Sequence, residues 1–172
     1  MELVSTSGCR GVTFCHPRSW GSTALDSTSL NSTSLDSTSW GCEGVVALEP
    51  GRADGGFRAN LVLTVAENSG LSFRDWQSKT DQMLPLLLRD YSLVDLERLK
   101  VAGLPGGRRC ARHLSSSGAL VLTNQWFTCV GDVGITLSGT ADVSSFGPLR
   151  TLFAQAAATL TLTSTDRTIG HS

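Results

Sequence analysis

The chain has 172 residues, with 14 basic and 15 acidic side chains and a formal net charge of −1. This length suits one ordinary domain, and the near-neutral charge argues against a general nucleic-acid binder, which needs a basic surface. No apolar run approaches the ~20 residues of a membrane-spanning helix, so we expect no integral membrane segment.

Five cysteines bear on the compartment, and they are Cys9, Cys15, Cys42, Cys110 and Cys129. Residues 1–5 have neither a positive start nor an apolar stretch, so we expect no signal peptide, reduced thiols and a cytoplasmic location. The alternative is a cell-envelope lipoprotein whose start lies upstream, because Thr6-Ser7-Gly8-Cys9 resembles the end of a bacterial lipobox. Cys15-His16 and Cys110…His113 could supply metal ligands if the fold joined them; we favour buried thiols and predict no metal site.

The first 40 residues predict one short strand and a long loop. Val12–Phe14 indicates an edge strand, with Trp20 as an aromatic lid over it. Residues 22–40 then contain three copies of a five-residue Ser/Thr-rich unit. One Leu in five residues cannot form a buried face at either the helix or the strand period, so we predict a flexible surface loop at 22–40.

The next segment predicts two strands and a helix. Residues 45–49 and 57–66 have strand patterns, separated by a turn at 54–56. A helix is expected from Ser72, whose side chain can accept the backbone N–H of Asp75, to about residues 89–90. Pro85 implies a kink or a new last turn. The apolar stripe of this helix is Phe73, Trp76, Thr80, Met83, Leu84 and Leu87.

The last third predicts a meander that ends in a second helix. Strands are expected at 91–101, 108–116, 119–130 and 133–141, with turns at 103–107, 115–118 and 131–132. Ser144 or Ser145 is expected to cap the final helix. Its apolar stripe is Phe146, Leu149, Leu152, Phe153 and Ala156.

Short turns between consecutive strands permit only antiparallel pairing, and two amphipathic helices need a sheet face to cover. The predicted fold class is therefore α+β: an antiparallel sheet of about six strands with amphipathic helices packed on it. We expect a single domain at 1–163, interrupted by the loop at 22–40, and a disordered tail at 164–172.

Several segments in this order resemble one protein family. They are the strand 57–65, the helix 71–91, the turn 103–108, Gln125-Trp126-Phe127 and the helix 146–153. Together they are similar to the LpqN/LpqT-type family of actinobacterial proteins, which has the PsbP-like fold.

The likeness covers residues 44–162, with a looser echo at 12–20, and Ala59 stands where the family usually has Pro. The resemblance implies a PsbP-like sandwich without a known catalytic site. Relatives of the broader fold serve as accessory subunits, adaptors or Eag-type chaperones that shield transmembrane helices of secreted effectors. Many members of the family are lipoproteins.

The candidate binding residues are Asn124, Trp126, Arg108 and Arg109. The two arginines could meet an anion, and Asn124 with Gln125 and Trp126 could line a groove; the alternative is cross-strand hydrogen bonding and core packing. Asp95 and Glu97 could bind a cation, although a solvated strand face is the simpler interpretation.

No G-x-S-x-G motif or histidine–acid pairing indicates a catalytic triad, so we predict a non-enzymatic protein without a cofactor. The leading hypothesis is an accessory protein, monomeric or homodimeric, that offers a concave sheet surface to a protein or peptide partner, as a secretion-associated chaperone or adaptor. The alternative is a small-ligand-binding protein with a pocket near Trp126 or Arg108 and Arg109.

Overall fold

The computed structural model describes residues 2–25, 43–53 and 55–163. The elements are β1 (Leu3–Cys9), β2 (Val12–Pro17), β3 (Gly21–Leu25), β4 (Glu43–Leu48), β5 (Asn60–Glu67), α1 (Phe73–Leu87), β6 (Arg89–Val101), β7 (Leu104–Leu114), β8 (Leu120–Val130), β9 (Val133–Asp142), α2 (Val143–Ala158) and β10 (Thr161–Leu162). A seven-stranded antiparallel sheet has the order β3-β4-β5-β9-β8-β7-β6, and a second, antiparallel sheet has the order β1-β2-β10. The predicted α+β architecture is confirmed.

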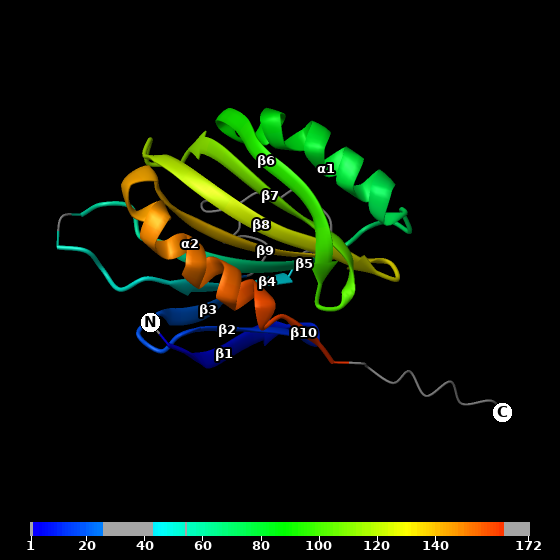
Figure 1. Ribbon diagram of the computed structural model, residues 1–172, viewed down its shortest axis with the longest axis horizontal. Coiled ribbons are helices and arrows are strands. Elements are labelled where there is room, and N and C mark those ends of the chain that lie inside the picture. The colour runs from blue at the N-terminus through cyan, green and yellow to red at the C-terminus, as the bar shows by residue number, and fades with distance from the viewer. Residues whose placement is uncertain (1, 26–42, 54, 164–172) are drawn as a thin grey trace.

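The two helices pack on opposite faces of the large sheet. Gly134 and Gly139 both lie on β9, and their separation of five residues places them on opposite faces. A Cβ on Gly134 would lie 2.6 Å from the Trp76 ring of α1, and a Cβ on Gly139 would lie 2.5 Å from the Phe153 ring of α2. Figure 1 shows α2 lying across the sheet and α1 running beside the β6 end.

The main core lies between the large sheet, α2 and the small sheet. Leu63 of β5, Leu137 of β9 and Phe153 of α2 are fully buried there, together with Phe14 of β2. The predicted α2 stripe is buried at Phe146, Leu152, Phe153 and Ala156. On the other face, α1 buries only Leu84 completely, so the two faces of the sheet are covered very differently.

The helix α1 begins as predicted and ends slightly earlier. The Ser72 side chain accepts the backbone N–H of Asp75 at 3.2 Å, as expected of an N-cap. Pro85 lies inside the last turn, and the helix ends at Leu87 because Leu88 already has extended backbone angles. Strand β6 therefore begins at Arg89, within the segment that the apolar pattern assigned to the helix.

The structure corrects the prediction for residues 2–25, which form three strands. Val12–Phe14 belongs to β2, which is the central strand of the small sheet because β1 and β10 pair with its two sides. Residues 22–25, predicted as loop, belong to β3 and pair with β4. Both β1 and β3 are edge strands, which need backbone partners but no regular apolar pattern. The remaining residues of the predicted loop, 26–40, and the predicted tail at 164–172 lie outside the described residues.

The predicted turn at 103–107 is much shorter in the structure. Val101 pairs with Leu104, so only Ala102 and Gly103 connect β6 to β7. Their φ angles are +50° and +79°, which is the pattern of a two-residue type I′ hairpin turn. Arg108 and Arg109 consequently lie inside strand β7, whose first residue is Leu104, and not beside the turn.

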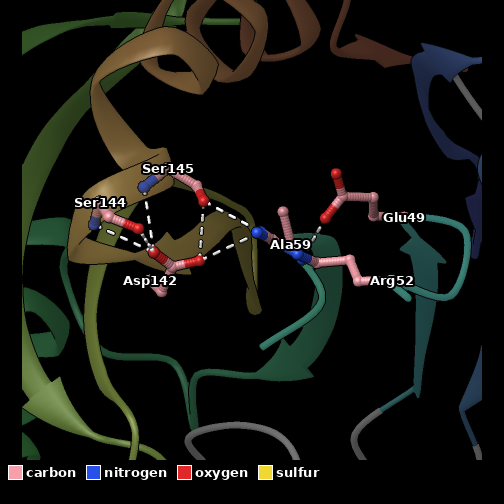
Figure 2. Close-up of polar contacts among 6 residues, drawn as sticks. All are labelled: Glu49, Arg52, Ala59, Asp142, Ser144 and Ser145. Carbon is pink, nitrogen blue, oxygen red and sulfur yellow. Dashed lines mark hydrogen bonds and ion pairs between the residues drawn. The ribbon is translucent and has the colours of Figure 1, made fainter. Parts of the chain in front are cut away.

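The start of α2 is anchored to the loop between β4 and β5 (Figure 2). Asp142, rather than the predicted Ser144 or Ser145, is the N-cap: its carboxylate accepts the backbone N–H groups of both serines at 3.0 Å. Arg52 donates to the Ser145 hydroxyl at 3.0 Å and lies 3.4 Å from the Asp142 carboxylate. A carboxylate accepts hydrogen bonds from both free N–H groups, and its negative charge is attracted to the positive end of the helix dipole.

Candidate functional site

Arg108 and Arg109 point to opposite faces of the large sheet, because side chains alternate along a strand. Arg108 lies on the α2 face, where its Nε donates to Glu97 at 2.6 Å and its Nη2 pairs with Asp95. Its Nη1 also donates to the Asn124 side chain at 3.4 Å. The hydrogen bonds that Glu97 and then Asp95 accept from it hold the pKa of Arg108 above its ordinary value. Arg108 is therefore the centre of a cross-strand ion-pair cluster on the β6–β7 edge.

The predicted groove beside Trp126 is not formed as one surface. Trp126 is buried in the main core, and Asn124 is buried on the same face. Gln125 points to the opposite face of β8, toward Arg109. Core packing and cross-strand hydrogen bonding thus account for Asn124 and Trp126.

Arg109 is buried on the α1 face, with only 3% of its side chain exposed. Its Nη2 pairs with Asp81 of α1, and its Nη1 donates to the Gln125 side-chain oxygen at 3.0 Å. The guanidinium carbon lies 4.8 Å from the centre of the Phe127 ring. The Arg109 Nε has no hydrogen-bond partner among the described residues. A buried donor in this state is rare in folded proteins.

Arg109 belongs to a continuous row of hydrogen-bonded side chains that runs across the α1 face of the sheet. Asp81 pairs with Arg109, Arg109 donates to Gln125, and Gln125 donates to the Ser138 hydroxyl at 3.2 Å. The chain therefore links α1 to β7, β8 and β9. We call these four residues the polar chain.

A pocket of about 90 Å³ lies between α1 and the sheet, above the polar chain, and we call it the α1 pocket. Its apolar walls come from α1 and from the sheet beneath it. These walls are Val62, Trp76, Met83, Leu84, Leu87 and Phe127. Arg109, Gln125 and Ser138 also line it, and the exposed residues Glu67 and Lys79 border it. Further polar side chains line it as well, namely Thr64, Asn68, Gln77, Thr80 and Thr136. The pocket thus combines apolar walls with convergent polar groups, the usual character of a small-molecule site.

The sequence pointed to Arg109, to Gln125 and to the apolar stripe of α1, but it missed Asp81 and the role of Phe127. Asp81 lies outside the predicted apolar stripe of this helix, and no short-range spacing connects it to Arg109. Phe127 and Gln125 are two residues apart on β8, so they lie on the same face of the sheet. This strand spacing is the one feature of the sequence that could have placed Phe127 beside Gln125. Trp76 was expected to point toward the sheet, and it does.

The two histidines in the described part of the chain, His16 and His113, lie in structural hydrogen-bond networks. His113 Nε2 lies 3.1 Å from the Thr123 hydroxyl, which in turn lies 2.9 Å from the Thr140 hydroxyl. Burial lowers the pKa of His113 below its ordinary value. His16 Nε2 lies 2.8 Å from the Ser7 hydroxyl, but His16 Nδ1 faces the Pro17 carbonyl at 3.0 Å, where a catalytic triad would have a carboxylate.

The proposed metal-ligand pairs are not joined by the fold. Cys15 and His16 lie in the small sheet, whereas Cys110 and His113 lie on β7, three positions apart and on opposite faces. Burial raises the pKa of the Cys110 thiol, which disfavours the thiolate form that binds metals. Across residues 2–25, 43–53 and 55–163, no three His, Cys, Asp or Glu side chains are grouped closely enough to hold a metal ion. Neither of the two described helices is long and apolar enough to cross a membrane.

No protein-family model matches the sequence, and no curated protein matches it. The structure, however, is similar to that of the cyanobacterial PsbP of Synechocystis, with a TM-score of 0.63 and 16% identity over 95% of this chain and 94% of that one. It is also similar to LpqN of Mycobacterium tuberculosis, a protein involved in cell envelope biogenesis, with a TM-score of 0.56 and 13% identity over 93% and 90% of the two chains.

A third similar structure is a Pseudomonas aeruginosa protein of unknown function, described as a putative regulator. Its TM-score is 0.59, with 12% identity over 95% of this chain and 100% of that one. At such identities the likeness establishes the fold alone. The chain has two helices on opposite faces of an antiparallel sheet, and almost the whole of each chain is aligned in these comparisons. The chain therefore has a PsbP-like fold.

Proposed function

We propose that this chain is a non-enzymatic accessory protein that binds a protein or peptide partner along the edge of β6. The observation that carries the proposal is a group of exposed apolar side chains on the last turn of α1 and on β6, which we call the β6 edge patch. Leu86 is 84% exposed, Val94 60%, Leu93 49% and Leu96 39%. Three of these side chains lie within four consecutive residues of β6, and exposed apolar side chains that lie together mark interaction sites, whereas singly scattered ones are normal.

The position of β6 in the sheet supports the same proposal. Strand β6 is the last of the seven strands and has 13 residues, which is long for an edge strand. Its register with β7 is uninterrupted from Asp95 to Val101, so this part offers a regular row of outward backbone groups. An extended peptide can add to this part of the edge through main-chain hydrogen bonds, with its side chains meeting Leu96. Leu93 and Val94 lie beside it, at the register shift between Leu93 and Asp95.

The sequence placed the partner on a concave sheet face, whereas the proposal places it on the edge. Each face of the large sheet carries a helix, and the α1 face is rich in polar side chains such as Thr136, Ser138 and Gln125. The finer proposal is an adaptor or secretion-associated chaperone for an apolar segment, within the LpqN-type family of PsbP-like proteins. The involvement of LpqN in cell envelope biogenesis agrees with an accessory role, and it is stated of that protein alone.

A site-specific photo-crosslinker at Val94 tests the proposal in cells of the native organism. A matched control carries the crosslinker at Val143, which is 46% exposed at the start of α2. The expected result is a discrete adduct from position 94 that is absent from position 143 and is lost when Leu96 is replaced by Lys. No adduct at position 94, or the same adducts at both positions, would overturn the proposal.

We propose cytoplasmic residence, with lipid attachment at Cys9 as the alternative. Cys9 ends β1, is half-buried and packs against the main core. The mass of the native N-terminal peptide distinguishes the two locations, because a lipid on Cys9 adds several hundred daltons and removes everything before it.

A further inference from the structure

We propose that the α1 pocket binds an uncharged amphiphile: a short apolar chain that ends in a hydrogen-bond acceptor such as a carbonyl oxygen. This site is separate from the β6 edge patch, so it adds a second binding activity to the proposed function. The inference rests on the Arg109 side chain and on the composition of the pocket around it.

The acceptor is inferred from the state of the Arg109 guanidinium. Arg109 lines the pocket, is almost completely buried, and has no partner for its Nε within the described part of the chain. Its two Nη atoms are already used by Asp81 and Gln125. The Nε itself is enclosed, so the guanidinium must turn toward the pocket before a ligand oxygen can accept from Nε and complete the hydrogen bonding of this buried group.

The absence of charge on the ligand follows from electrostatics. The charged side chains at the pocket already balance, because Asp81 contacts Arg109 directly, and Glu67 and Lys79 add one charge of each sign. A carboxylate ligand would bring a second negative charge beside Asp81 and would lose its own hydration, whereas a ketone, ester or amide oxygen would not. An uncharged acceptor therefore fits the pocket better than an anion does.

The apolar chain follows from the walls and the size of the pocket. Trp76, Met83 and Leu84 of α1 face Val62 and Phe127 of the sheet across it. A cavity of about 150 Å³ holds the six carbons of benzene. By that measure, the 90 Å³ of the α1 pocket holds a chain of about four carbons, with any remainder in the open mouth.

Two probes with the same four-carbon tail test the inference on the full-length protein: 2-hexanone, which carries an uncharged acceptor, and sodium pentanoate, which carries a carboxylate. The readout is the NMR signal of the Arg109 Nε–H, with the Arg108 Nε–H as internal control because that group already donates to Glu97. We expect 2-hexanone to shift the Arg109 signal saturably in the millimolar range, as its few heavy atoms allow. The Arg108 signal should not move, and pentanoate should bind more weakly.

Two variants locate the probe. Arg109→Lys keeps a positive charge for Asp81 but has no Nε donor, and it should weaken 2-hexanone binding about tenfold, which we follow through the Trp76 indole N–H signal. Thr136→Leu adds apolar bulk to the pocket lining, leaves Arg109 in place, and should abolish binding. Thermal melting verifies that each variant is folded.

The proposal is overturned if 2-hexanone leaves the Arg109 signal unmoved, if pentanoate binds as tightly, or if Thr136→Leu binds 2-hexanone like the parent protein. Failure here would leave the β6 edge proposal untouched, because the crosslinking test uses none of these residues.

Discussion

Replacing Asp81 by Ala is the most direct test of how α1 is held on the sheet. The substitution leaves the positive charge of Arg109 buried, with Gln125 and the Phe127 ring as its remaining contacts. Removing one partner of a fully buried ion pair costs about 3–5 kcal/mol. Asp81 keeps 35% of its side chain exposed, so the expected loss is roughly two-thirds of that, about 2–3 kcal/mol. For a chain of this length, that corresponds to a fall in Tm of about 4–12 °C.

Urea unfolding followed by circular dichroism measures this loss as a shift of the midpoint at constant slope. Gln82→Ala, at an exposed neighbouring position of α1, is the matched control and should change stability by less than about 0.5 kcal/mol. In the double variant with Arg109→Met no buried charge remains, so the two costs should fall short of additivity by about 1–2 kcal/mol. A cost for Asp81→Ala below about 0.5 kcal/mol, or strict additivity, would refute the reasoning.

Three further substitutions, with Leu86→Ala as a control, address other parts of the fold. Burial lowers the pKa of His113, so the folded state binds a proton more weakly than the unfolded state does. Its stability contribution is therefore complete above about pH 6.5 and is lost as the pH falls toward the lowered pKa; His113→Gln should flatten this part of a pH series of urea midpoints. Asp142→Ala removes the α2 N-cap and should cost about 1 kcal/mol in the same assay, whereas an unchanged midpoint would contradict the capping role. Phe153→Ala should cost about 3–5 kcal/mol because this ring is fully buried, and Leu86→Ala, at an exposed site, less than about 0.5 kcal/mol.

Periodic segments of the chain were predictable, and their predictions are confirmed. The alternation in β5 places Leu61, Leu63 and Val65 on the core face, and the three-and-four spacing in α2 identifies its buried residues. Both elements bury one face against the main core, so the spacing of their apolar residues identifies which side chains are buried. The order of strands and helices then leaves few ways to assemble an antiparallel sheet.

The candidate site was predictable only in part. The strand assignment around Arg108 and Arg109 already implied that adjacent residues face opposite sides, so their separation follows from the sequence. The pairing of Arg109 with Asp81 does not, because it depends on where α1 lies over β7, and that placement is a tertiary result. Strands β1 and β3 were missed for a related reason: their pairing is made by backbone groups, which leave no mark on the side-chain pattern.

The unequal burial of the two helices has a consequence for how the molecule opens. The helices have similar lengths, 15 residues for α1 and 16 for α2, yet α2 contributes five buried residues and α1 contributes one. The position of α1 therefore depends on few contacts, which are the burial of Leu84, the packing of Phe73 and Trp76 on Phe127, and the Asp81–Arg109 ion pair. Their loss would release the helix while the main core stays intact. Amide hydrogens of α1 should exchange with solvent through this local detachment, far faster than those of α2, which wait for global unfolding.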